Sequence, residues 1–357
     1  MRRTEVSLDL AALRHNLQRL REAAPGSRVM AAIKANGYGH GLERVARSLV
    51  DVDALGVACV EEAVSLREAG IQTPITLLEG FFHTDELSLL CQYHLDCVIH
   101  HVHQIEVLEK QPLSSRLKVW LKVDSGMHRL GIPATDCIAL WQRLNAIKGV
   151  EVIGLMTHLA NADNLNDTTT EQQLALFNKS CGELPGKRTI ANSAGVLGWP
   201  QSHAEGNRPG ISLYGVSPMI GGRGEQHGLR PVMTLRSELI AVNHLKQGDA
   251  IGYGGSWHCP EDMAVGVVAV GYGDGYPRHA ESGTPVLING QRVPLVGRVS
   301  MDMISVDLRS LPEAKIGDEV VLWGEGLPVE EIAERAATIP YELLCGVTGR
   351  VRIVEQD

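Results

Sequence analysis

The sequence predicts an α/β plus β protein, in which an N-terminal (β/α)8 TIM-type barrel is followed by a mainly antiparallel β domain. Two observations carry this prediction. Short apolar strands alternate with helices over Val29–Tyr214, and β-rich segments with little helix follow from about Leu229. With 357 residues, the chain also exceeds the usual size of a single core. We therefore place the barrel at residues 6–229 and the β domain at residues 230–357, with residues 1–5 joining the β domain.

The barrel region begins with a helix and continues with eight strands. Apolar residues at helical spacing predict the first helix over Leu8–Leu20. Short apolar runs then predict strands at Val29–Ile33, Leu55–Ala58, Ile75–Leu78, Cys97–Ile99, Lys118–Val123, Val152–Met156, Thr189–Ala191 and Ile211–Tyr214. Helical segments lie between most of them, which is typical of parallel strands joined by crossover helices. Eight such strands favour a closed barrel over an open doubly wound sheet.

The remaining chain is expected to be rich in strands. Predicted strands lie at Thr234–Val242, Ala264–Val270, Val286–Ile288, Val293–Val296, Met303–Val306 and Glu319–Leu322, with Gly, Pro and Asn turns between them. One helix is expected near Val329–Ala337. The glycine-rich segment Ser217–Arg230 is interpreted as the boundary, in the form of a hinge or an exposed loop.

Composition narrows the classes of function. A formal net charge of −9, without a basic cluster, argues against binding to nucleic acid or to an anionic membrane. The amino terminus lacks an apolar signal region and no run is long enough to span a bilayer, so we expect a cytoplasmic protein. The seven cysteines form no C-x-x-C pair, which predicts reduced thiols and no zinc site. We expect no metal and a small-molecule substrate.

One stretch, Val29–Gly41, reads VMAAIKANGYGHG and is unusual for a purely structural element. Its apolar strand ends on Lys34, and a glycine-rich turn that carries Tyr38 and His40 follows. Lysine is a poor nucleophile at neutral pH unless its surroundings lower its pKa. Lys34 is therefore either a reactive amine held over a ligand or an ordinary lysine that extends from a strand end into water.

Other predicted strand ends also carry functional groups. A (β/α)8 barrel builds its active site at the carboxyl ends of its strands, because the loops that follow the strands meet there. Besides Lys34 and Tyr38, the candidates are Lys122, Asp124 and Arg129 in LKVDSGMHRLG, His158 in MTHLANAD, Asn192 and Ser193 in ANSAG, and Arg208, which precedes the predicted eighth strand in RPGISLYG. The accumulation of such residues at strand ends indicates a site rather than assorted caps and turns.

The β domain has three motifs of its own. Tyr253 lies in IGYGGSW, Tyr272 lies in VGYGDGYPR, and Arg298, Met301 and Asp302 lie in GRVSMDMISVDL. Each motif alone is typical of a tight turn with an aromatic side chain packed nearby. Together they indicate a second group of site residues.

These motifs identify a family resemblance. KANGYGHG, KVDSGMHRLG, THLANAD, ANSAG, RPGISLYG, GYGGSW, GYGDGYPR and GRVSMD occur in the order found in the alanine racemases, and they extend over nearly the whole chain. The chain thus resembles enzymes of fold type III that use pyridoxal 5′-phosphate and consist of an α/β barrel followed by a β domain. The resemblance implies interconversion of L-alanine and D-alanine by a cytoplasmic homodimer with shared active sites.

The resemblance also implies a role for each motif residue. Lys34 would bind the cofactor covalently and serve as one acid–base group, and Tyr253 of the partner subunit would be the other. Arg208 would face the pyridine nitrogen. The remaining cofactor-binding positions would be Tyr38, His158, Asn192, Ser193, Gly210, Ile211 and Tyr341, and the substrate side would include Arg129, Met301, Tyr272 and Asp302.

The resemblance leaves an alternative at Lys122 and shows a departure at Thr189. Lys122 matches a lysine that is often carbamylated in relatives, but an ordinary lysine paired with Asp124 is an equal alternative. Some relatives have a histidine that supports the pyridine-facing arginine, and Thr189 occupies that position here. We therefore expect a weaker partner for Arg208.

The chemistry supports the two-base interpretation independently of the resemblance. Racemisation removes the Cα hydrogen from one face and returns one to the other, so it needs two groups on opposite sides of the substrate. Lysine and tyrosine suit each other, because both have ordinary pKa values of about 10. The alternatives are a racemase of broader specificity or one for serine or basic amino acids, a fold type III decarboxylase, and a non-catalytic pyridoxal phosphate carrier. A carrier of this kind would lack the β domain.

Overall fold

The structure is a computed structural model that describes residues 3–356. The chain forms two compact units. Unit 1 consists of Met1–His15, Tyr214–Ser217 and Gly221–Asp357, and unit 2 consists of Asn16–Leu213 and Pro218–Ile220. No helix in the described range is long and apolar enough to cross a membrane.

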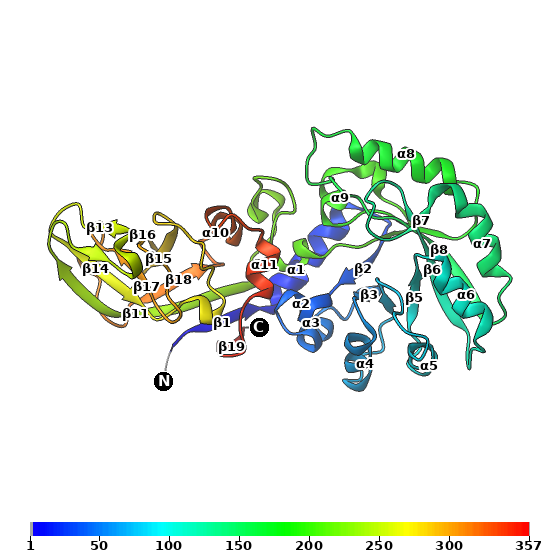
Figure 1. Ribbon diagram of the computed structural model, residues 1–357, viewed down its shortest axis with the longest axis horizontal. Helices are drawn as coiled ribbons and strands as arrows, with labels where there is room; N and C mark the ends of the chain where they lie inside the picture. The colour runs from blue at the N-terminus through cyan, green and yellow to red at the C-terminus, as the bar shows by residue number, and fades with distance from the viewer. Residues whose placement is uncertain (1–2, 357) are drawn as a thin grey trace. The chain divides into compact units, whose positions relative to one another are not determined.

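Unit 2 is a closed parallel barrel of eight strands, as the sequence predicts (Figure 1). The strands follow one another around the ring in the order β5, β4, β3, β2, β10, β9, β8 and β6, and β5 pairs with β6 to close it. Their bounds are β2 Arg28–Ala32, β3 Ala54–Val57, β4 Ile75–Leu77, β5 Asp96–Ile99, β6 Leu117–Asp124, β8 Val150–Met156, β9 Lys187–Thr189 and β10 Gly206–Asn207. A two-residue strand, β7 Ile132–Pro133, extends β6 outside the ring.

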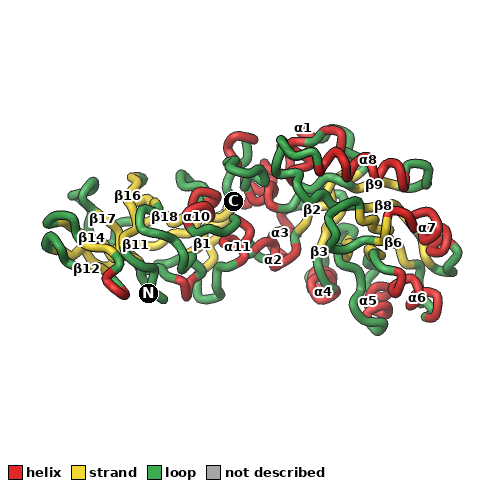
Figure 2. The backbone as a smooth tube through the Cα atoms, turned by 45° about the horizontal axis from the view of Figure 1, so that its top comes forward, coloured by secondary structure: helices red, strands yellow, loops and turns green. Residues whose placement is uncertain are grey.

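Helices α4 to α8 lie around the outside of this ring (Figures 1 and 2). The α-helices from the start of the chain to the last barrel strands are α1 Leu10–Ala23, α2 Lys34–Tyr38, α3 Leu42–Ser48, α4 Val60–Glu68, α5 Glu86–Gln92, α6 Val102–Lys110, α7 Cys137–Asn145, α8 Thr169–Cys181 and α9 Ser193–Gly198. Three 3-10 turns accompany them: η1 Ala134–Asp136, η2 Pro200–Ser202 and η3 Ile211–Tyr214. The short strands read as continuous apolar runs because both of their faces are covered, and Leu55, Val57 and Ile75 are fully buried.

The position of the eighth strand differs from the prediction. The apolar run Ile211–Tyr214 is the turn η3, and the ring is completed by β10, which pairs with β2 and β9. Pro209 explains where the strand stops, because proline has no N–H to donate to a neighbouring strand. Ile211 and Tyr214 are apolar because the turn is buried, not because it forms a strand. Arg208 therefore follows the last strand, at its carboxyl end, instead of preceding it.

Unit 1 is built on an eight-stranded sheet that is antiparallel apart from the β1–β19 pair. Its order is β14, β17, β16, β15, β18, β11, β1 and β19, and β14 also pairs with β11, so that six of the strands close on themselves. The bounds are β1 Glu5–Asp9, β11 Met233–Leu245, β14 Met263–Val268, β15 Pro285–Ile288, β16 Gln291–Val296, β17 Ile304–Asp307, β18 Glu319–Trp323 and β19 Arg352–Gln356. The unit also contains the β12 Ala250–Ile251 and β13 Trp257–His258 pair, α10 Val329–Arg335, α11 Pro340–Cys345, and the 3-10 turns η4 Gly224–His227, η5 Tyr253–Gly255 and η6 Tyr272–Asp274.

The division into units differs from a boundary at residue 229, because unit 1 includes Tyr214–Ser217 and the chain from Gly221 onward, and at the amino terminus it extends to His15 instead of ending at residue 5. Strand β1 pairs antiparallel with β11 and parallel with β19, which ties residues 5–9 to the β domain. The segment around Ser217–Arg230 is also held in place. The buried Glu330 carboxylate accepts hydrogen bonds from the backbone N–H of Ser217 at 3.0 Å and of Gly224 at 2.9 Å. The segment is therefore anchored at both of these points, although several of its residues, including Ile220, are exposed.

Candidate active site

Lys34 lies directly after β2, at the start of an unusual backbone turn. The next four residues, Ala35, Asn36, Gly37 and Tyr38, all have left-handed φ angles, between 52° and 63°. This conformation costs about 1–2 kcal/mol for each residue that has a side chain. Backbone bonds hold it in place, from Gly37 N–H to Ile33 O at 2.8 Å and from Gly41 N–H to Asn36 O at 2.9 Å. Such strain concentrates at functional sites, where the surrounding structure fixes it.

Two glutamates support Lys34 and its turn, and neither is a residue that the sequence motifs indicate. Glu79, just after β4, places its Oε1 atom 3.6 Å from the Lys34 Nζ atom. Glu62, in α4, accepts hydrogen bonds from Ala35 N–H at 2.7 Å and from Ala58 N–H at 2.9 Å. Lys34 itself remains about one-third exposed, with 36% of its side chain accessible. The amine is thus held near one carboxylate while it stays open to a ligand.

Arg208 is buried just after β10, the strand that pairs with β2, and its guanidinium contacts the ends of β8 and β9. Its Nη1 atom donates to Thr189 Oγ1 at 2.6 Å, and its Nη2 atom donates to the backbone oxygens of Thr157 and Ile190. The Nη2 atom also lies 3.4 Å from His158 Nδ1. Burial lowers the pKa of Arg208 to about 10, so the side chain is still a cation at neutral pH. It can only donate hydrogen bonds.

Positive charge is concentrated around the barrel strand ends, and it affects two neighbours. Burial, then Arg208, Arg129 and Lys34, lower the pKa of Lys122 to about 8. Burial, then Arg208 and Lys122, lower the pKa of His158 well below its ordinary value. His158 is therefore neutral at pH 7. Its Nδ1 atom can accept a hydrogen bond from Arg208, whereas a protonated ring would repel the guanidinium.

Lys122 and Asp124 do not form the pair that one interpretation of the sequence expects. The Asp124 carboxylate instead accepts hydrogen bonds from the backbone N–H groups of Gly126, Met127 and His128, at 2.9, 3.1 and 3.1 Å. Within residues 3–356, Lys122 forms no ion pair with a carboxylate, and its side chain is buried. Asp124 thus shapes the loop that leads to Arg129, and the amine of Lys122 lies near three cations, whose effect Glu79 partly opposes.

Hydroxyl and backbone N–H groups gather between the start of α9 and the segment that follows β10. We call this group, formed by Tyr38, Ser193 and Gly210, the cradle. Ser193 Oγ accepts hydrogen bonds from the N–H groups of Gly210 at 2.9 Å and Ser212 at 3.3 Å. A side chain at position 210 would lie only 2.4 Å from the hydroxyl oxygen of Tyr38, so glycine there lets the phenol keep its place. Asn192 caps α9 by accepting from Gly195 N–H at 2.9 Å. The predicted residues Tyr38, Ser193 and Gly210 thus meet at the start of η3, which begins with Ile211.

In unit 1, the predicted site residue Tyr253 is strongly exposed. It opens η5, between β12 and β13, and 70% of its surface is accessible. Arg298 lies beside it, because a side chain added at Gly254 would lie 3.3 Å from the Arg298 Nη1 atom. Tyr341, in α11, is also partly exposed. The turn that carries Tyr253 therefore has an arginine next to its backbone, and the Tyr253 side chain is exposed.

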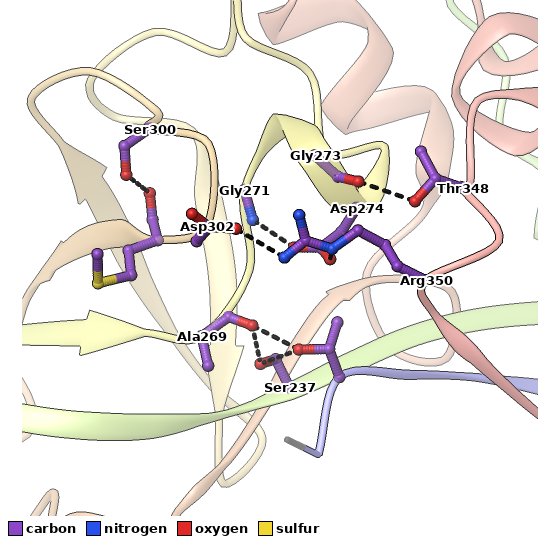
Figure 3. A network of polar contacts seen from close by, with 11 residues as sticks. Ser237, Ala269, Gly271, Gly273, Asp274, Ser300, Asp302, Thr348 and Arg350 are labelled. Carbon is purple, nitrogen blue, oxygen red and sulfur yellow. Dashed lines mark hydrogen bonds and ion pairs between the residues drawn. The ribbon is translucent and has the colours of Figure 1, made fainter. Parts of the chain in front are cut away.

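Tyr272, Met301 and Asp302 lie on two loops that are joined along their backbones. Tyr272 N–H donates to Ser300 O at 3.0 Å, and Gly273 N–H donates to Met301 O at 2.9 Å. The Asp302 carboxylate accepts a hydrogen bond from Arg350 Nη2 at 2.6 Å (Figure 3). Arg350 is a residue that the sequence motifs miss. Within the described part of the chain, no group of three or more His, Cys, Asp or Glu side chains is arranged to hold a metal ion.

Comparison with family models gives matches over most of the chain. The model described as "Alanine racemase, N-terminal domain" matches residues 8–218, and the model described as "Alanine racemase, C-terminal domain" matches residues 232–355.

Individual proteins show the same similarity. The chain is 55% identical over 346 residues to the alanine racemase of Nitrosococcus oceani, covering 96% of this chain and 97% of that protein. It is 50% identical over 361 residues to the alanine racemase of Coxiella burnetii strain RSA 493, covering 99% of each. The crystal structure of the biosynthetic alanine racemase from Pseudomonas aeruginosa superposes with a TM-score of 0.97 at 44% identity and covers 100% of both chains.

Proposed function

The chain belongs to the alanine racemase family, and from that premise we propose that it interconverts L-alanine and D-alanine with the help of pyridoxal 5′-phosphate. The observation that carries this proposal is the arrangement of side chains at the carboxyl ends of the barrel strands. There the Lys34 amine projects from a strained turn beside a buried arginine and a hydroxyl-lined cradle.

The residues at these strand ends fit the chemistry of pyridoxal 5′-phosphate. A phosphate suits the cradle of Tyr38, Ser193 and Gly210 at the start of η3, because hydroxyl and backbone N–H groups stabilise its oxygens. A side chain at Gly210 would fill that cradle. The amine of Lys34 suits the aldehyde, and Arg208 supplies a donor for the ring nitrogen. When bound, the cofactor withdraws electrons from the Cα atom of the amino acid and makes its hydrogen acidic.

Lys34 and Tyr253 are proposed to move the proton on opposite faces of the substrate. Lys34 holds or releases a proton at Nζ, and Glu79, 3.6 Å away, steadies the ammonium form. Tyr253 holds or releases a proton at its hydroxyl on the other face of the substrate. We propose that this tyrosine comes from the partner subunit of a homodimer, and its 70% exposure supports a role outside its own unit.

Arg208 is proposed to limit how strongly the ring draws electrons. A guanidinium donates to the ring nitrogen without giving up its proton, so that the nitrogen stays unprotonated. Thr189 and two backbone oxygens hold the guanidinium in this position. His158 is neutral and lies beside it, where it can pack against the ring without adding charge.

The substrate side is proposed to consist of Arg129, which would bind the alanine carboxylate, and of Tyr272 and Met301, which would limit the side chain. Lys122 is proposed to be carbamylated. Its lowered pKa of about 8 supports this, because only a neutral amine adds carbon dioxide, and the resulting carboxylate would face Arg129 and Arg208. The unmodified amine is the alternative. The proposed location is the cytoplasm, since a reducing environment suits seven free thiols.

Circular dichroism with separate solutions of L-alanine, D-alanine, L-serine and L-lysine tests the proposed activity. The purified protein with pyridoxal 5′-phosphate should abolish the optical signal of both alanine enantiomers, and the Lys34→Ala variant should leave both signals unchanged. Faster conversion of serine or lysine would show a racemase of different specificity. Release of carbon dioxide without racemisation would show a decarboxylase, and no reaction with any substrate would favour a carrier.

A further inference from the structure

Arg350 joins two loops of unit 1 by contacting an acidic residue on each. Its Nε atom lies 3.1 Å from Asp274 Oδ1, and its Nη2 atom donates to Asp302 Oδ1 at 2.6 Å (Figure 3). Asp274 belongs to η6, which begins with Tyr272, and Asp302 directly follows Met301. One guanidinium therefore connects the segment that carries Tyr272 with the segment that carries Met301.

The two carboxylates differ in a way that assigns them different roles. The side chain of Asp274 is completely buried, and its Oδ2 atom accepts a hydrogen bond from Gly271 N–H at 2.9 Å. Asp302 is half exposed. A buried carboxylate needs a nearby cation because it has lost its hydration. Asp274 thus anchors the guanidinium from inside the fold, and Asp302 binds the same guanidinium at the surface.

The contacts around Arg350 leave little freedom. A side chain at Gly273 would lie 2.6 Å from its Nη1 atom, so the guanidinium packs against the bare backbone of that loop. Thr348, two residues before Arg350, donates its hydroxyl to Gly273 O at 2.8 Å and its N–H to Asp274 O at 3.2 Å. The segment that carries Arg350 is therefore itself fastened to the Tyr272 loop.

We propose that Arg350 is a positioning residue, which binds Asp274 and Asp302 together and thereby fixes Tyr272 and Met301 on the substrate side of the active site. This inference rests on the proposed function for the roles of Tyr272 and Met301. It also changes the role of Asp302, which the sequence places among the substrate-binding residues. Since its carboxylate is bound by Arg350, Asp302 acts through the loop and not on the amino group of the substrate.

A double-mutant cycle on alanine racemisation tests the proposal. Asp302→Ala and Arg350→Met should each raise the KM for L-alanine about tenfold, the scale of one lost charge-assisted hydrogen bond, with kcat changed much less. The double variant should be no worse than Arg350→Met alone, because Asp302→Ala removes nothing further once Arg350 is gone. If the two increases in KM multiply, Asp302 acts independently of Arg350 and the proposal is wrong. Unchanged KM values in both single variants would also overturn it.

Hydrogen exchange supplies a readout that does not depend on activity. Arg350→Met should speed amide exchange in the peptides that contain Tyr272 N–H and Gly273 N–H, which bind Ser300 O and Met301 O. Unchanged exchange there would contradict the proposal. If the wild-type protein shows this protection but does not racemise alanine, the proposed function fails and the connection made by Arg350 stands.

Two variants complete the design. Arg352, exposed at the start of β19 and without an ion pair in the described residues, provides the matched control, and Arg352→Met should leave KM and exchange unchanged. Arg350→Lys covers the case in which Arg350→Met does not fold. Lysine keeps a cation for Asp274 but lacks the planar fork that reaches both carboxylates. It should fold and still raise KM, and a KM equal to that of the wild type would overturn the proposal.

Discussion

Arg208 donates a hydrogen bond to Thr189 Oγ1 at 2.6 Å, and both side chains are buried in the barrel. The hydroxyl supplies the acceptor at the position where some relatives have a histidine. A hydroxyl does not compete with the guanidinium for positive charge, so Thr189 fixes the orientation of Arg208 without changing its protonation.

Replacement of Thr189 by valine should therefore leave one buried N–H of Arg208 without its acceptor. We expect the free energy of unfolding to fall by about 1–3 kcal/mol and racemisation to slow. Urea unfolding and the circular dichroism assay measure the two effects. Thr189→Ser keeps the hydroxyl and should remain close to the wild type. If valine and serine behave alike, the hydrogen bond does not hold Arg208.

Lys34→Ala should abolish both the visible absorbance of bound pyridoxal 5′-phosphate and the exchange of the alanine α-hydrogen with solvent. The reason is that Lys34 supplies the amine at the start of the strained turn that follows β2. Absorbance spectroscopy of the dialysed protein and proton NMR in D2O provide the measurements. Retention of the absorbance after this substitution would show that Lys34 is not the residue that holds the cofactor.

Tyr253→Phe should keep the cofactor bound, because the exposed phenol of Tyr253 lies in a different unit from the cradle. Exchange of the α-hydrogen should slow by about a hundredfold or more for one alanine enantiomer and much less for the other, as expected for loss of one general base. Trp257→Phe, a partly buried position in the same motif, serves as a control for disturbance of the loop. Equal slowing of both enantiomers would count against bases on opposite faces.

Lys122→Met tests the charge state of the Lys122 side chain through the pH dependence of the free energy of unfolding. The pKa of Lys122 is lowered from 10.5 to about 8, so the folded protein binds fewer protons than the unfolded chain between these pH values. The free energy of unfolding therefore rises with pH over this window, and the full penalty applies below pH 8. In buffer without bicarbonate, Lys122→Met should raise the free energy of unfolding at pH 7 by at most about 3 kcal/mol.

This stabilisation should fall steadily as the pH rises from 8 to 10.5, where the amine is neutral in the folded protein and half neutral in the unfolded chain. Urea unfolding at pH 7 and at pH 10.5 gives the comparison. Carbamylation reverses the sign, because methionine then replaces a negative charge that faces Arg129 and Arg208. Bicarbonate should accordingly make the substitution destabilising, and intact mass spectrometry should show the added carbon dioxide. Absence of that mass in bicarbonate would leave Lys122 an unmodified lysine.

The periodic features of the sequence predict most of the fold. Apolar runs that alternate with amphipathic helices place the first six barrel strands, since both patterns report burial directly. The seventh strand, Lys187–Thr189, shares only Thr189 with the predicted Thr189–Ala191. The predicted position of the eighth strand is wrong, because a buried turn that contains Ile211 and Tyr214 has the same apolar pattern as a strand. The membership of residues 5–9 in the β domain depends on pairing with β11 and β19, which lie more than two hundred residues away.

The site residues that lie in glycine-rich motifs can be predicted from the sequence. The residues that contact them from distant parts of the chain cannot. KANGYGHG indicates Lys34 because its glycines mark a turn at the end of a buried strand, but Glu62 and Glu79 carry no local pattern. His158 is neutral because burial and cations from other strands lower its pKa. These neighbours are distant in the sequence, so the local motif does not predict the charge of the ring. Arg350 is missed for the same reason, because its two carboxylates come from separate loops.

The central claim is that two different groups exchange the proton on opposite faces of alanine. Racemisation of L-alanine and of D-alanine in D2O, followed by chiral mass spectrometry at early times, tests it most directly. We predict that the product enantiomer from either direction carries deuterium at Cα, because the group that returns the proton is not the one that removed it. Product that retains the original hydrogen from both directions would contradict the roles of Lys34 and Tyr253, and no conversion at all would contradict the proposed function.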